Sequence, residues 1–191
     1  AHAYWRFGAD TFYVARTTQV PTALPAPILI PWREVSRRLE RVTPDRPFQT
    51  FYDLFLLNYR ISPRAAKDSP ALIDNIELLV PTFGSETERI FYGAFIEMHV
   101  HYTPVVRTLC ELEENVIADR PDDVAAGLET LARCFVQAAK VWAKIGPRPG
   151  AKHFCDPVIW AKTVAILGVP PAGCPQGGTS GACAPIIHLI D

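Results

Sequence analysis

The stretch Glu97-Met98-His99-Val100-His101 contains the residue types that bind metal ions. A His-x-His pair with a nearby carboxylate holds iron or zinc well on a β-strand, where residues two apart point the same way. The apolar residues around this stretch recur instead every three or four positions, and on a helix residues two apart point about 200° apart. We therefore expect His99 and His101 to be ordinary helix residues and not metal ligands. The remaining histidines are isolated in the sequence, and we expect the same of them: His2, His153 and His188.

A second candidate is the glycine-rich stretch of residues 177–185, GGTSGACAP, which precedes an apolar run. It lacks the Gly-Lys-Ser/Thr ending of a phosphate-binding loop. Free amide groups and hydroxyls at such a turn into a helix can hold an anion, for example a phosphate or a carboxylate. A plain loop followed by a helix cap is the alternative, and these residues alone favour it.

Nucleophile and disulfide chemistry find little support in the sequence. The chain has five cysteines, an odd number, widely spaced and without a Cys-x-x-Cys pair, which argues against a disulfide framework and a zinc site. No serine lies in a Gly-x-Ser-x-Gly motif, so covalent catalysis has no sequence support. We expect reduced thiols.

Composition and charge limit the class of partner. The 191 residues are 49% hydrophobic and carry a formal net charge of −1, with acidic and basic residues interspersed. Such a chain can bury a sizeable core and has no electrostatic footprint for nucleic acid or an anionic membrane. No apolar run approaches the roughly 20 residues of a membrane span, and the first residues do not have the basic, apolar and small-residue order of a secretory signal. We expect a cytoplasmic protein with a small-molecule or protein partner.

The elements that must position any site are predicted to be helices. Four prolines within residues 20–31 predict an irregular segment, followed by a short helix over 32–41. Aromatic and aliphatic residues three and four apart predict a buried helix over 48–59 and another over 86–102. Thr103 and Pro104 together predict a helix break, with Thr103 as the cap of a further helix.

The clearest pattern follows Pro121, where apolar residues alternate spacings of four and three as far as Ile145 and predict a long amphipathic helix ending at Gly146-Pro147. A last helix is expected to open at Asp156-Pro157 and to end near Gly168. No segment shows the alternation typical of strands. The predicted fold class is therefore all-α, with long loops at 17–31 and 169–180.

Five segments, in order and at compatible distances, together resemble the indoleamine 2,3-dioxygenase family of haem-dependent oxygenases. They are LPAPILIPWREVSRRLE, FYDLFLLNYR, IFYGAFIEMHVHYTP, DPVIWAKTVAILG and GGTSGACAPIIHLID. The resemblance covers about residues 24–191. It implies a helical haem-binding fold, with residues 1–31 as the end of a small N-terminal region and proline-rich linker, and residues 32–191 as the first part of the large haem domain.

The resemblance also implies roles for particular residues. The cofactor would be haem b, crossed near the distal pocket by the glycine loop: Gly178, Thr179, Ser180 and Gly181. Thr179 stands where the family has its loop serine, and Ser180 where a small residue faces the haem. The family's iron-ligating histidine lies well beyond the loop, so it is expected after residue 191, and no metal ligand is expected within this chain. The substrate pocket would be lined by Phe51, Phe91, Tyr92, Phe95, Trp160 and Ala165.

Two departures from the family pattern concern the substrate. Ala165 stands where tryptophan-cleaving members have an arginine that grips the substrate carboxylate, and Phe95 replaces a pocket serine of some members. An alanine cannot bind a carboxylate, and a contact of that kind is worth about 1.5–3 kcal/mol. The resemblance therefore implies a dry, aromatic pocket for a substrate without a free carboxylate. Lys162, which lies three residues from Ala165, is a weak candidate for a replacement cation.

The expected function is that of a haem-dependent oxygenase acting with O2 on an aromatic, indole-like substrate, without nucleic acid or membrane. The alternative is a catalytically inactive haem or small-ligand binding protein of the same fold. A helical interaction scaffold without a cofactor is a third possibility, and it predicts colourless protein with an exposed apolar stripe on a long helix. The sequence specifies neither the substrate nor the oligomeric state.

Overall fold

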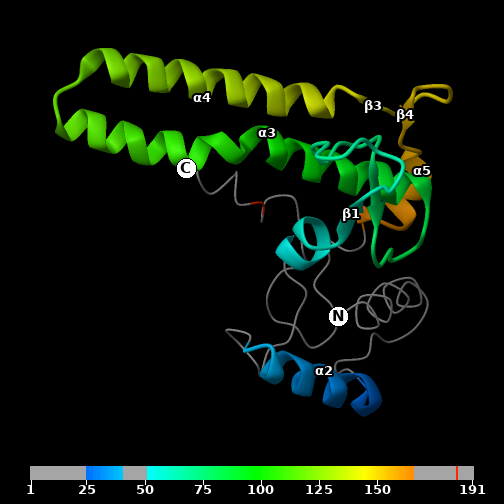
Figure 1. Ribbon diagram of the computed structural model, residues 1–191. Helices are drawn as coiled ribbons and strands as arrows, with labels where there is room; N and C mark the ends of the chain where they lie inside the picture. The colour runs from blue at the N-terminus through cyan, green and yellow to red at the C-terminus, as the bar shows by residue number, and fades with distance from the viewer. Residues whose placement is uncertain (1–24, 41–50, 166–183, 185–191) are drawn as a thin grey trace. The chain divides into compact units, whose positions relative to one another are not determined.

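The computed structural model describes residues 25–40, 51–165 and 184 of the chain (Figure 1). Contacts divide the chain into two compact units, which are treated separately below. The first comprises residues 1–58, 79–88 and 157–191, and the second comprises residues 59–78 and 89–156. The predicted boundary between residues 31 and 32 stays a prediction, and residues 1–24 lie outside the described part.

Among its described residues, the first unit contains two short helices and a π-helical turn. Helix α2 spans Ala26–Arg38, η1 spans Tyr52–Leu56 and α5 spans Pro157–Lys162. The expected irregular segment up to residue 31 is wrong, because α2 begins at Ala26. Pro27 lies in the first turn, where no backbone N–H is needed, and Pro31 removes only one internal hydrogen bond. The opening of α5 at Pro157 confirms the predicted start of that helix, but the expected end near Gly168 is wrong, because α5 ends at Lys162.

The predicted helix over 48–59 is only partly present. Helical structure among the described residues runs from Phe51 to Leu56, and the chain then enters strand β1, Tyr59–Ile61. Asn58 fixes this transition: its side chain accepts the Val80 N–H at 2.9 Å and donates to the Val80 carbonyl at 3.0 Å. Side-chain bonding of this kind offers the backbone an alternative to another helical turn.

The second unit is dominated by a helical hairpin, seen in Figure 1 as two long ribbons that lie side by side. Helix α3 spans Glu86–Ile117, and its first turn belongs to the other unit. Helix α4 spans Pro121–Trp142, so the predicted long helix after Pro121 is confirmed, but it ends before the expected Ile145. Asp119 adopts a left-handed φ of 52° in the connection, a conformation that Asp tolerates better than most residues. A Cβ added at Gly127 would lie 2.6 Å from Leu112 Cδ2, so the two helices approach closely at that point.

The predicted break at Thr103-Pro104 is wrong, because α3 continues through Pro104. Pro104 has no N–H for the carbonyl one turn back, but nearby hydroxyls bind other carbonyls of the helix. Thr103 donates to the His99 carbonyl and Thr108 to the Pro104 carbonyl, both at 3.0 Å. Thr103 therefore bonds back into the helix instead of capping a new one.

Two small sheets were not predicted. Strand β1 pairs antiparallel with β2, Ile76–Leu78, in the register Tyr59 to Leu78, and β3, Ile145–Gly146, pairs parallel with β4, His153–Phe154. Strands of two or three residues are too short to show an alternating pattern. The fold remains mostly helical, and among the described residues no helix has the length and apolar character of a membrane span.

The first of these sheets packs on α3 to form a small core in the second unit. Its buried centre is Ala71, Ile76 and Ile96, and its partly buried rim is Tyr59, Ile61 and Val100. The long stripe predicted on α4 is less buried than expected, because Leu128 is 56% exposed. The buried residues of the helix are Ala138, which belongs to the predicted stripe, and Val141, which does not.

Candidate functional site

Two of the predicted pocket residues, Phe91 and Phe95, lie one turn apart on α3 and contact each other. Their ring centroids are 5.2 Å apart in an edge-to-face arrangement. Trp142, the last residue of α4, contacts both rings, with centroids 6.0 Å from Phe91 and 4.8 Å from Phe95. Phe95 is buried, whereas Phe91 keeps part of its ring accessible. The three rings form one aromatic cluster, in which Phe91 is partly exposed.

Met98 completes this cluster on the α3 side. The Trp142 indole N–H donates to Met98 Sδ at 3.4 Å, and Met98 is buried. A polarizable sulfur beside aromatic rings is a favourable contact of up to about 1.5 kcal/mol. The sequence placed Trp142 on the α4 stripe but gave it no role at the site. The signal was available in part, because Trp142 is an aromatic residue at the end of the strongest helical pattern in the chain.

The other predicted pocket residues are distributed differently. Tyr92 follows Phe91 on α3 and is fully buried. Phe51, Trp160 and Ala165 belong to the first unit, where the buried Phe51 stacks on Phe55 with ring centroids 4.4 Å apart. Trp160 lies on α5 and is half-buried, as is Ala165 beyond the helix. The proposed cofactor residues Gly178, Thr179, Ser180 and Gly181 lie outside the described residues.

A second face of α3 binds the segment that precedes β2. Three residues at successive intervals of four, Arg89, Gly93 and Glu97, all meet Ile73. The Arg89 side chain donates to the Ile73 carbonyl, and the Glu97 carboxylate accepts the Ile73 N–H at 2.9 Å. A Cβ on Gly93 would lie 3.3 Å from Ile73 Cα, so glycine permits the close approach. This spacing is that of one helix face.

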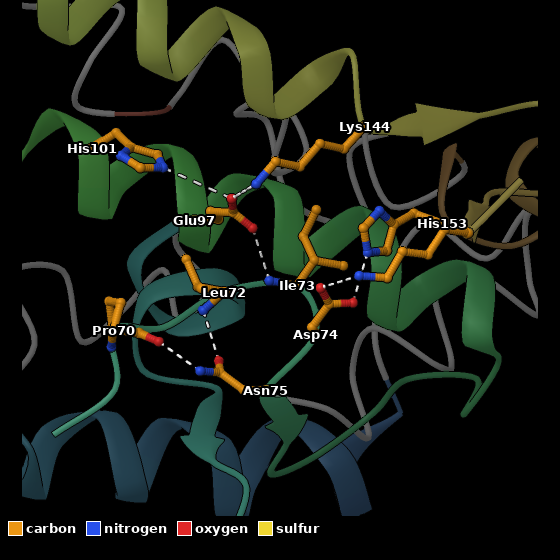
Figure 2. A network of polar contacts seen from close by, with 10 residues as sticks. Pro70, Leu72, Ile73, Asp74, Asn75, Glu97, His101, Lys144 and His153 are labelled. Atoms are coloured by element: carbon orange, nitrogen blue, oxygen red, sulfur yellow. Dashed lines mark hydrogen bonds and ion pairs between the residues drawn. The ribbon is translucent and has the colours of Figure 1, made fainter. Parts of the chain in front are cut away.

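The Glu97 side chain is only 1% exposed and is the centre of a polar network, which Figure 2 shows. Lys144, just after α4, forms an ion pair with Glu97 Oε1. His101 Nε2 lies 3.8 Å from the same oxygen. A buried carboxylate needs such partners, because taking its charge out of water is otherwise very costly. Glu97 and His101 of the Glu-x-His-x-His stretch therefore contribute to the packing around α3.

A neighbouring cluster holds the other end of the same segment. Asp74 Oδ1 accepts from His153 Nε2 at 2.8 Å, and Asp74 Oδ2 accepts from Lys152 Nζ at 2.7 Å (Figure 2). The pKa of the Asp74 carboxyl is lowered mainly by the hydrogen bond from Lys152 and next by the hydrogen bond from His153. Lys152 and the buried His153 thus attach the start of β4 to the Ile73–Asp74 segment.

The His99 ring lies against the backbone of α3 one turn earlier. Its Nδ1 lies 2.6 Å from the Phe95 carbonyl, and since a carbonyl only accepts, Nδ1 carries the proton. Burial lowers the pKa of His99, although the Phe95 carbonyl acts in the opposite direction. The imidazole thus forms a side-chain hydrogen bond across one turn of α3, between His99 and the backbone of Phe95 in the aromatic cluster.

Three histidines lie within residues 51–165, and each has a protein contact: His99 with Phe95, His101 with Glu97 and His153 with Asp74. In the same part of the chain no group of three or more His, Cys, Asp or Glu side chains is arranged to hold a metal ion. The cluster of Phe91, Phe95 and Trp142 suits a flat apolar ligand. The expectation that the iron-ligating histidine follows residue 191 stays a prediction.

Comparison with protein families gives one match. The family model for indoleamine 2,3-dioxygenase matches residues 8–164, which is more than half of the chain. The match includes the α3 aromatics and ends before Ala165 and the glycine loop. No curated protein matches the chain. Because the family pattern extends over both the helical hairpin and the aromatic cluster, the chain belongs to the indoleamine 2,3-dioxygenase family.

Proposed function

We propose that this chain forms part of a haem-dependent oxygenase that inserts oxygen from O2 into an aromatic, indole-like substrate. Family membership supports haem and dioxygenase chemistry in general. Bound haem would supply the activation of O2, and the protein would bind the substrate, orient it and exclude water. The axial histidine would come from outside the described residues.

The observation that carries the proposal is the partly open ring of Phe91 beside the rings of Phe95 and Trp142. An indole placed on Phe91 would find an apolar surface on which aromatic rings stack or meet edge to face, contacts worth about 0.5–1.5 kcal/mol each. Phe51, Tyr92 and Trp160 are proposed as further pocket residues. Gly178 and Gly181 would let the backbone approach the porphyrin, and Thr179 and Ser180 would donate hydrogen bonds at its edge.

The substrate class follows from the side chains that replace polar groups. Phe95 is buried against Trp142 and offers no hydroxyl. Ala165 offers no cation, so an amino-acid substrate should bind about one to two orders of magnitude more weakly than it would with an arginine there. We propose a neutral aromatic substrate, such as a substituted indole without a carboxylate.

The test is the absorbance spectrum of the purified full-length protein, followed by oxygen uptake with indole and tryptophan. The proposal predicts a haem band that responds to reduction and to O2, with indole turned over faster than tryptophan. Phe91→Ala should weaken indole binding about tenfold, whereas Val136→Ala, an exposed change on α4, should leave it unchanged.

Two results would contradict the proposal in different ways. Folded protein that takes up no haem would end the assignment to oxygen chemistry. Haem uptake without turnover across a broad panel of indoles would favour the non-catalytic binding protein, which the absent arginine at position 165 already makes a reasonable second candidate.

A further inference from the structure

The end of α4 is fastened to α3 at two points that flank Ala143. On one side the Trp142 ring contacts Phe91 and Phe95 and donates its N–H to Met98. On the other side Lys144 forms its ion pair with the buried Glu97. Because both anchors bind the same two turns of α3, from Phe91 to Met98, the indole of Trp142 has little freedom to move away from the phenylalanines.

Phe91 depends on this arrangement for its own orientation. Its ring meets Phe95 edge to face on one side and Trp142 edge to face on another, at interplanar angles of 75° and 61°. The rotamers open to a ring are limited by the neighbours that it meets. The edge contacts with Phe95 and Trp142, together with a tilted contact to Tyr92 at 6.4 Å between centroids, limit the orientations of the Phe91 ring.

We propose that Trp142 is a positioning residue that fixes the orientation of the Phe91 ring and thereby limits the size of the aromatic ligand accepted there. The inference rests on the proposed function, because it takes Phe91 as part of the substrate wall. Trp142 itself is 36% exposed, so the space that its indole fills is open to solvent. Shortening this side chain would make that space available to a larger ring system.

The chain offers a closely matched control on the same helix. Phe135 is also 36% exposed and also meets an α3 aromatic edge to face, namely Tyr102, with centroids 5.5 Å apart. It does not belong to the Phe91 cluster. Phe135→Leu therefore removes an equivalent helix-to-helix contact without touching the proposed site, and it reports what loss of such a contact does to the fold alone.

The experiment compares Trp142→Leu, Trp142→Phe and Phe135→Leu in the full-length protein. The first measurement is NMR of protein labelled at phenylalanine, with the Phe91 signal assigned from the Phe91→Leu variant. The second is the dissociation constant for indole, which has two fused rings, and for carbazole, which has three. Neither measurement requires turnover, so both remain informative if the oxygenase assignment fails.

The proposal predicts that Trp142→Leu shifts and broadens the Phe91 signal and changes the carbazole-to-indole preference about tenfold in favour of carbazole. Trp142→Phe, which keeps a ring, should restore most of the indole preference, and Phe135→Leu should change neither quantity. An unchanged Phe91 signal in Trp142→Leu would overturn the inference, even in an active enzyme. Equal effects of Trp142→Leu and Phe135→Leu would also overturn it, since they would show a structural role only. Absence of haem in the wild-type protein would contradict the oxygenase instead.

Discussion

The Glu97 carboxylate on α3 lies 2.9 Å from the backbone nitrogen of Ile73, a residue 24 positions earlier in the chain. Arg89, two turns before Glu97, meets the carbonyl of the same residue, and Gly93, one turn before Glu97, lies against its Cα. One helix face thus contacts the N–H, the Cα and the carbonyl of Ile73. Phe91 and Phe95 provide an aromatic surface on a different face of the same helix.

Removing the Glu97 carboxylate should destabilise the second unit substantially. Glu97→Ala leaves the buried Ile73 amide without its acceptor and Lys144 without its partner, and a charge-assisted hydrogen bond of this kind is worth about 1.5–3 kcal/mol. We expect a loss of about 2–3 kcal/mol in the free energy of unfolding, measured by urea denaturation. Glu113→Ala, an exposed change on the same helix, is the control, and an equal loss in both variants would refute a special role for Glu97.

The Glu88 carboxylate should protect the turn that leads into α3. It accepts the backbone N–H groups of Thr82, Phe83 and Gly84 at 2.7, 2.9 and 2.8 Å, while Ser85 Oγ accepts the Glu88 N–H at 3.1 Å. Glu88→Ala should accelerate hydrogen exchange at residues 82–84 by at least tenfold, because three amides lose their acceptor. Glu86→Ala removes a charge from the same first turn and is the matched control. Unchanged exchange in Glu88→Ala would contradict these bonds.

The Asp74 cluster should give a small acid-dependent contribution to stability. Its pKa is lowered in the folded protein by Lys152 and His153. Asp74 therefore stabilises the fold above its ordinary pKa of about 3.9, and this contribution disappears as the pH falls through the lowered value. Asp74 is 53% exposed, so we expect less than about 1 kcal/mol.

The measurement is the difference in unfolding free energy between wild type and Asp74→Asn from pH 7 to pH 2. The difference should be constant at neutral pH and should shrink below about pH 4. Glu111→Gln, an exposed change on α3, should not show this profile. A difference that grows as the pH falls would have the wrong sign for this pair.

Gly127 should resist replacement although it lies within a helix. Alanine would be favoured there by about 1 kcal/mol of helix propensity, but its Cβ would meet Leu112 Cδ2 at 2.6 Å. Overpacking costs about 1–3 kcal/mol. After the gain in helix propensity is subtracted, Gly127→Ala should lower the free energy of unfolding by between zero and about 2 kcal/mol. Combining it with Leu112→Ala removes the clash, and thermal denaturation of the double-mutant cycle should show a favourable coupling. Simple additivity would mean that the two helices are further apart at this point.

The sequence by itself determined the helical class, the long helix after Pro121 and the start of the last helix at Pro157. These predictions rest on local features, namely the spacing of apolar residues and a proline in the first helical turn. Such features remain valid in the folded protein because a helix forms along one continuous segment. The same local reasoning failed at Pro31 and Pro104. A helix tolerates a missing N–H when the lost energy of one hydrogen bond is recovered by packing and by nearby hydroxyls.

Only the tertiary structure decided which of the predicted residues meet. Phe91 and Phe95 could be identified as neighbours from their spacing, but the contact with Trp142 depends on how α4 returns along α3. The Ile73 amide on Glu97, the His153 ring on Asp74 and the strands at 59–61 and 76–78 likewise join residues distant in the chain. Such contacts form when a chain closes on itself, and no pattern within a short window of sequence encodes the geometry of that closure.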